Sequence, residues 1–121
     1  MEVIYTYSRA DSIADGMQKK CELASQAGFN FPVFITKGIN DLVNESLKYG
    51  ANSYNGVMWD MLSMLHTQIK RSQQDTDFIK FKVWINWKGN RQKAFIFVAS
   101  VGALDVDKPQ PAFTIMLPDE D

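Results

Sequence analysis

The sequence predicts an α+β fold in which a mostly antiparallel sheet, built on a C-terminal hairpin plus a third strand, has helices packed on one face. Three observations support this expectation. Apolar residues recur with the period of a helix over residues 57–72 and with the period of a strand over residues 78–101. Gly89-Asn90 interrupts the alternating segment with the residue types of a two-residue hairpin turn.

The N-terminal segment predicts a strand and a short capped helix. Residues 2–7 are mostly β-branched and aromatic, which favours a strand. Ser8 and Asp11 have the spacing of a capping box, which satisfies backbone N–H groups at a helix start. A helix is therefore expected from Arg9 until Gly16, because glycine suits the left-handed backbone beyond a helix end.

The middle of the chain predicts two helices with a strand between them. Residues 17–27 are expected to form a helix that ends at Gly28, and residues 29–35 to lead into a strand. Thr36 is a suitable N-cap for a helix over residues 37–49.

The strongest helical pattern follows a polar loop at residues 51–56. Residues 57–72 carry one continuous apolar stripe, and Lys70-Arg71 lie where the helix dipole favours cations. The stripe consists of Met58, Met61, Leu62, Leu65 and Ile69.

The last third of the chain predicts three sequential strands. Residues 78–87 and 92–101 alternate on either side of the predicted turn. Residues 105–111 are expected to be a loop, because two prolines are poorly compatible with a helix interior or a central strand. Residues 113–117 form the third expected strand.

With a two-residue turn, Lys88 pairs with Arg91, and this register places one set of side chains on the core and another on the open face. The open face then collects basic and aromatic residues, namely Lys80, Lys82, Trp84, Lys88, Arg91, Lys93, Phe95 and Phe97. A slip of one residue would exchange the faces.

Three interpretations fit this open face. Lysine stems often lie over aromatic rings on a solvated sheet face, and a helix or a second subunit could equally cover the rings, so a homodimer is one alternative. The same face could bind a protein partner. Basic side chains interleaved with aromatic rings also suit single-stranded nucleic acid, provided that Trp84 and Phe97 are exposed.

Composition excludes several classes of site. The 121 residues contain one cysteine and one histidine, too few for an internal disulfide or a cysteine/histidine zinc site. Thirteen basic and 14 acidic residues give no overall attraction to nucleic acid or membrane, so any attraction requires charge separation within the fold. No apolar run approaches the ~18 residues of a membrane span. We expect a single domain over residues 1–121 in a reducing cytoplasm.

No convergent set of catalytic residues appears, and we expect a protein that is not an enzyme and uses no cofactor. His66 has no nearby group to complete a catalytic triad and is expected to be a partly buried structural residue. Cys21 is expected to be a small core or boundary residue. Trp59, next to Asp60 on the predicted long helix, is expected to pack over the sheet edge rather than act as a binding anchor.

The carboxylates predict no metal site. Asp11 and Asp15 are four residues apart on one helix, with Arg9 as the adjacent cation, and a capping role is favoured over metal binding. The acidic residues 119–121 are expected to form a solvated tail.

The two ends of the chain carry dense patterns, Tyr7-Ser-Arg-Ala at the start of a segment that closes with Ile13-Ala-Asp-Gly, and Thr114-Ile-Met-Leu-Pro-Asp-Glu-Asp at the end. Together with Trp59-Asp-Met-Leu, these patterns resemble a family of small uncharacterised bacterial proteins carried by plasmids and phages. The resemblance implies one domain in the bacterial cytoplasm but no chemistry. Residues 44–55 depart from the family pattern.

We therefore expect a non-enzymatic accessory protein of mobile genetic elements that binds a host macromolecule, with a host protein as the leading partner. The resemblance alone implies the sharpest form of this hypothesis, an anti-defence inhibitor of restriction or CRISPR machinery. The alternative is a small single-stranded nucleic-acid-binding module that uses the basic, aromatic sheet face.

Overall fold

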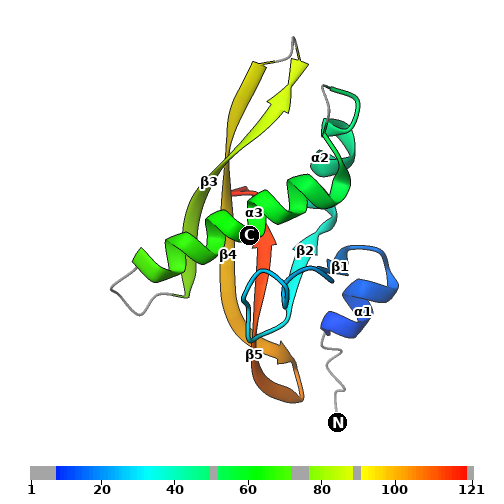
Figure 1. Ribbon diagram of the computed structural model, residues 1–121. Coiled ribbons are helices and arrows are strands. Elements are labelled where there is room, and N and C mark those ends of the chain that lie inside the picture. Colours follow the sequence, from blue (N-terminus) through cyan, green and yellow to red (C-terminus); the bar gives the residue numbers. More distant parts are fainter. Residues whose placement is uncertain (1–7, 50–51, 72–76, 89–90, 120–121) are drawn as a thin grey trace.

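The computed structural model describes residues 8–49, 52–71, 77–88 and 91–119, and within them the chain forms three helices and one five-stranded sheet (Figure 1). The helices are α1 (Arg9–Ala14), α2 (Lys37–Ser46) and α3 (Tyr54–Arg71). The strands are β1 (Gln18–Lys20), β2 (Val33–Thr36), β3 (Phe78–Trp87), β4 (Arg91–Asp105) and β5 (Lys108–Met116). The predicted α+β class is confirmed. The strand expected over residues 2–7 lies outside the described residues.

The sheet has the strand order β1-β2-β5-β4-β3, which brings the first half of the chain beside its C-terminal strand. β3, β4 and β5 form an antiparallel meander, as the sequence predicts. β2 inserts next to β5 as the parallel pair of the sheet, with Phe34 opposite Thr114, and β1 pairs antiparallel with β2 at the edge. The sheet is therefore mostly antiparallel.

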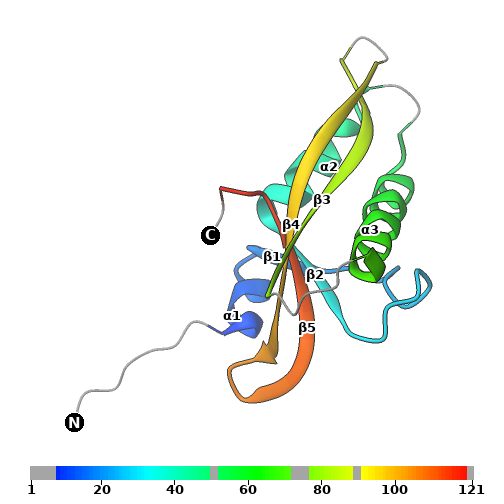
Figure 2. The same ribbon diagram turned by 90° about the vertical axis from the view of Figure 1, so that its left-hand side faces the viewer.

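The two faces of the sheet are covered differently. α2 and α3 bury the inner face in a single core, in which Met61, Leu62 and Leu65 of α3 meet Phe81 and Phe97 of the sheet. α1 lies on the opposite, outer face, where the Arg9 guanidinium stacks 4.2 Å from the ring centroid of Phe34 (Figure 2). The expectation of helices on one face thus holds for α2 and α3 but not for α1.

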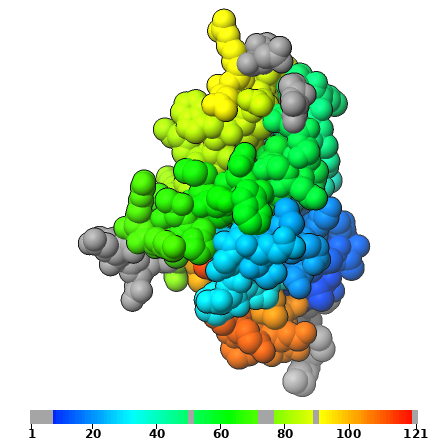
Figure 3. All heavy atoms as spheres, in the orientation of Figure 1, coloured from blue at the N-terminus to red at the C-terminus, as the bar shows by residue number. Residues whose placement is uncertain are grey.

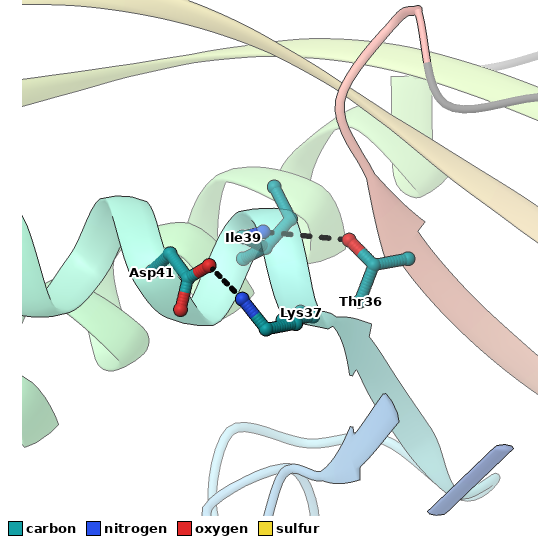
Figure 4. A network of polar contacts seen from close by, with 4 residues as sticks. All are labelled: Thr36, Lys37, Ile39 and Asp41. Carbon is teal, nitrogen blue, oxygen red and sulfur yellow. Dashed lines mark hydrogen bonds and ion pairs between the residues drawn. The ribbon is translucent and has the colours of Figure 1, made fainter. Parts of the chain in front are cut away.

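Capping residues position the first two helices as expected. The capping box between Ser8 and Asp11 is present at α1, and Gly16 beyond its end has φ +75°. The Thr36 hydroxyl accepts the Ile39 N–H at the start of α2, where Lys37 and Asp41 form an exposed ion pair of 2.7 Å (Figure 4). α2 ends at Ser46, three residues before the predicted end.

α3 begins before its predicted start. Residues 54–56, expected in a loop, form its first turn, because the Ser53 hydroxyl accepts the Gly56 N–H at 3.0 Å and acts as a cap. The predicted stripe is on the core side, with Met58, Met61, Leu62 and Leu65 buried and Ile69 partly buried.

The helix predicted over residues 17–27 is wrong. Residues 18–20 form β1, and Cys21 N–H donates to the Val33 carbonyl oxygen at 2.8 Å. The following residues form turns that end at Gly28, whose φ is +97°. Pairing with β2 takes the backbone groups that a helix would have used, while Ala24 is still buried in the core.

The loop predicted over residues 105–111 is also wrong, because β4 and β5 continue into a hairpin that turns at Val106 and Asp107. Proline is tolerated where its nitrogen points away from a partner strand. Phe113 N–H donates to the Pro32 carbonyl on the β2 side, and Pro111 has its nitrogen on the same side, beyond the last β2 pair. The proline therefore costs no ladder hydrogen bond.

Candidate nucleic-acid interface

The β3–β4 hairpin pairs one residue out of the predicted register. Trp87 lies opposite Arg91, so three residues connect the strands, two of which (89–90) lie outside the described residues. β3 keeps its predicted faces, but a one-residue slip turns every side chain of β4 to the other side. The pairs that were expected between Trp84 and Phe95 and between Lys82 and Phe97 do not form.

This slip divides the predicted basic and aromatic surface between two faces. Lys80, Lys82 and Trp84 remain on the outer face. Arg91, Lys93, Phe95 and Phe97 lie on the inner face, opposite Trp87, Ile85, Val83 and Phe81 respectively. Phe97 is 0% exposed, so the condition for a single-strand stacking surface, an exposed Phe97 beside Trp84, is not met.

β3 and β4 extend beyond the rest of the sheet as a two-stranded ribbon. β4 pairs with β5 only from Val98 onward, so residues 81–87 and 91–97 form a ribbon of two strands, which we call the arm. The arm lies at the top of the molecule (Figures 1 and 3). Its inner face packs against the segment that follows α2, where the Trp87 ring lies 5.2 Å from the Tyr49 ring between centroids. Trp87 also lies 5.0 Å from Phe95 on the same face of the arm.

The outer face of the arm is open. Trp84 is 53% exposed and Ile96 43% exposed, and the Lys82 ammonium lies 6.0 Å from the Trp84 ring centroid. Asn86 and Gln92 form a directly opposed pair nearer the turn. At the base of the arm, Val98 is buried beside a cavity of about 250 Å³ that Phe78, Lys80, Val98, Met116, Leu117 and Pro118 line.

Charge is separated within the fold, which total composition does not reveal. Residues 78–104 contain five of the 13 basic residues and none of the 14 acidic ones. These five are Lys80, Lys82, Lys88, Arg91 and Lys93, and all are exposed. The ion pairs found among the described residues are Lys37–Asp41 and Lys48–Glu45, so no described carboxylate pairs with the five. The rest of the chain carries eight basic and 14 acidic residues.

Cations near the turn also contact the aromatic cluster on the inner side. The Lys93 ammonium lies 5.2 Å from the Phe95 ring centroid, and that of Lys88 lies 6.0 Å from the Tyr49 ring centroid. The pKa of Glu45 on α2 is lowered, chiefly by its hydrogen bond with Lys48 and less by the charge of Lys88. The positive end of the arm thus extends over the C-terminal end of α2.

Arg9, which belongs to the N-terminal sequence pattern, has a structural role: it attaches α1 to the sheet. Its guanidinium donates to the Gln18 and Thr114 side chains at 2.8 and 2.9 Å and to the Leu104 and Ala103 carbonyl oxygens at 2.6 and 3.4 Å. These partners tie α1 to β1, β4 and β5. Burial is the main cause that lowers the Arg9 pKa, against the opposing charge of Asp105. Because its donors are engaged, Arg9 is not positioned to bind a ligand anion.

Replacing Arg9 with lysine should destabilise the protein nearly as much as replacing it with alanine. One ammonium cannot reproduce the planar fork that reaches four acceptors. We expect both variants to lose about 2 kcal/mol of unfolding free energy, the scale of charge-assisted hydrogen bonds at a half-exposed site. Urea unfolding measures this loss, with Lys37→Ala as the control at an exposed ion pair. A stable Arg9→Lys variant would show that charge alone holds α1.

Asp105 completes the attachment of α1 from the β4–β5 hairpin. Its carboxylate accepts the backbone N–H groups of Arg9, Ala10 and Val106 at 2.9, 3.0 and 2.8 Å. These backbone hydrogen bonds, that of Val106 first, lower the Asp105 pKa. Asp105 therefore caps the first turn of α1 across 95 residues of sequence, a contact that local patterns cannot predict.

The other candidate residues for catalysis or binding are His66, Cys21 and Trp59. His66 is half-buried, with its ring 5.5 Å from the Phe29 ring centroid in an edge-to-face contact. Cys21 is 4% exposed, and burial raises the pKa of its thiol to about 12. Trp59 is 43% exposed and stands outside the core cluster, in contrast to the packing expected for it, and Asp60 beside it is exposed.

Carboxylates do not converge on a metal site in the part of the chain that the structure describes. Asp11 takes part in the capping box of α1, and Asp119 is exposed beyond β5. In the same described ranges, no helix has the length and apolar character needed to cross a membrane.

Comparison with known proteins returns no relative: no protein-family model, no curated protein and no solved structure matches this chain. The plasmid and phage family resemblance therefore stays a prediction, and any function is argued from the arm and its charges.

Proposed function

We propose that this chain is a nucleic-acid-binding protein that uses the β3–β4 arm to contact the phosphate backbone. The observation that carries the proposal is the concentration of five exposed basic residues, without one carboxylate, over residues 78–104. A basic patch on an otherwise acidic protein is the electrostatic footprint of a phosphate-binding surface. The acidic remainder of the chain, with eight basic against 14 acidic residues, would orient the arm toward a polyanion and the body away from it.

Two features of the arm support contact with phosphates. Lys82 at its base and Lys88 near its turn lie at opposite ends of the ribbon, so cations are distributed along it instead of gathering at one point. None of the five basic residues forms an ion pair with a described carboxylate. Each phosphate contact releases counterions, and the affinity should therefore fall steeply as salt rises.

Charge reversal on the arm should weaken nucleic-acid binding about 100-fold or more. The test compares the Lys82/Arg91/Lys93→Glu variant with a Lys20/Lys70/Lys108→Glu control, which changes the net charge equally at exposed sites off the arm. Fluorescence anisotropy with labelled 20-nucleotide single strands and 20-base-pair duplexes, from low to moderate salt, measures the affinity. Loss of three phosphate contacts should also make the duplex salt slope shallower by about 2.7.

The control variant should stay within about fivefold of the wild type. Equal losses in both variants would mean that net charge, not the arm, governs binding. No binding of either oligonucleotide at low salt would overturn the proposal. Circular dichroism on each variant establishes that it is folded.

A second candidate function is the one favoured in the sequence analysis, binding to a host protein as an accessory factor of a mobile element. The specific observation in its favour is Trp84, which is 53% exposed near Ile96 and has Lys82 as its neighbour on the same face. Tryptophan is enriched among residues that dominate binding at protein interfaces. Affinity purification with wild type and Trp84→Ala separates this candidate: a protein captured by the wild type alone, in nuclease-treated lysate, would support it over nucleic acid.

A further inference from the structure

The outer face of the arm carries side chains that can read base edges and a cation near its base, and further cations lie at the turn end of the arm. Asn86 and Gln92 are directly opposed, and Trp84 and Ala94 form the next pair on the same face. Lys82 lies on this face toward the base of the arm, while Arg91 lies on the inner face at the turn end and the Lys88 ammonium approaches Tyr49 on the inner side. The inner face is packed against α2 and α3, so this outer face is the one that a ligand can approach.

The arm is poorly suited to single strands. Proteins that bind single strands without sequence preference stack successive bases on several exposed rings. Phe97 is fully buried, and the half-buried Phe95 contacts Trp87 and Phe97, with ring centroids 5.0 and 6.3 Å away. Among the described residues of the arm, Trp84 is thus the aromatic side chain exposed on the outer face. One exposed ring cannot stack several successive bases.

The dimensions of the arm suit a duplex groove. The major groove of B-DNA, about 12 Å wide, admits a two-stranded ribbon, whereas the major groove of A-form RNA is too deep and narrow for side chains to read. Lys82 and Lys88 are six residues apart on one strand, about 20 Å at ~3.3 Å per residue, so cations at both ends can reach the phosphates that border the groove. The amide pair lies between them.

We infer that the partner is double-stranded DNA, with the arm in the major groove and its outer face toward the bases. Asn86 and Gln92 would meet the base edges, where carboxamides pair well with the N6 and N7 atoms of adenine. Lys80 and Lys82 would contact phosphates from the outer face, and the exposed Lys88, Arg91 and Lys93 from the inner side near the turn end of the arm. This inference rests on the proposed function and adds the form of nucleic acid, the groove and the two amides to it.

The first experiment compares four probes by anisotropy at one salt concentration: a mixed-sequence 20-base-pair DNA duplex, each of its single strands, and the RNA duplex of the same sequence. We expect the DNA duplex to bind at least about tenfold more tightly than the others. Equal or tighter binding of a single strand or of RNA would overturn the groove inference and leave the proposed function standing. Failure of all four probes would overturn both.

The second experiment tests the groove and the amides together. In a duplex with 7-deazaadenine for adenine, the major-groove N7 acceptor is removed while the phosphates and the minor-groove edge are kept. Wild-type protein should bind this duplex about fivefold or more weakly than the unmodified one, the scale of one lost bidentate contact. In Gln92→Ala and Asn86→Ala/Gln92→Ala the difference between the two duplexes should shrink.

The control variant is Gln110→Ala, an exposed glutamine on β5 outside the arm, which should respond to the modified duplex as the wild type does. Gln92 is exposed, so its replacement should leave the melting temperature unchanged. Wild-type binding that does not respond to the modified duplex would overturn major-groove contact. A response that persists undiminished in the double variant would overturn the role of the amide pair.

Discussion

Replacing Phe97 with alanine should lower the free energy of unfolding by about 3–5 kcal/mol, whereas replacing Phe78 with alanine should cost less than about 1 kcal/mol. The two residues are the same type and lie on the paired strands β4 and β3. Phe97 is 0% exposed in the core cluster, with its ring 5.9 Å from that of Phe81, and Phe78 is 58% exposed. The expected difference therefore comes from burial and from the cavity that alanine leaves at position 97.

Urea or thermal unfolding of the two variants beside the wild type measures this difference. The experiment also tests the register of the hairpin, because the two-residue turn would have placed Phe97 on the open face with Lys82. A Phe97→Ala variant as stable as Phe78→Ala would contradict the observed register. It would also restore the single-strand stacking surface as a candidate.

Replacing Leu62 with alanine should cost about 2–5 kcal/mol, and replacing His66 with alanine should cost clearly less, about 1 kcal/mol. Leu62 is fully buried where α3 meets the inner face of the sheet. His66, one turn further along, is half-buried, and its resolved contacts are the Phe29 edge and the close approach of Gly28, where a Cβ would lie 3.2 Å from Nε2. Removing the imidazole therefore loses one aromatic contact and little buried surface.

Thermal melts monitored by circular dichroism rank these variants. Met64→Ala, on the exposed side of the same helix at 40% exposure, serves as the control for helix propensity. If His66→Ala were the least stable of the three, the histidine would have a structural role that its observed contacts do not explain.

Local signals predicted the helices well where the side chains that decide them are close in sequence. The capping box at Ser8, the Thr36 cap and the apolar stripe of α3 all act within one or two helical turns, and each is present in the structure. The segment 17–27 shows the limit of this reasoning. Its apolar positions do face the core, but its backbone pairs with Phe34–Thr36, and no local pattern announces that partner.

The prediction of which β4 side chains share the open face with Lys82 and Trp84 was wrong for a similar reason. Residues 94–99 of β4 are apolar on both faces of the strand, so hydrophobic alternation does not decide which set is buried. The turn length then decided the faces, and an additional connecting residue moved Phe95 and Phe97 inward and brought Gln92 outward. The amide pair of Asn86 and Gln92 could have been found only by considering the three-residue alternative.

Residue type and spacing over short distances predict the α+β class, the antiparallel pairing of β3 with β4, and the basic character of the segment that contains the arm. The tertiary structure alone decided the register of that pairing, the parallel insertion of β2 beside β5, and the attachment of α1 to the outer face through Arg9 and Asp105. The last two depend on contacts between residues far apart in the chain, whose free energies outweigh local preferences but leave no local pattern in the sequence. The register depends on the length of the connection between β3 and β4, because the apolar residues of β4 lie on both of its faces.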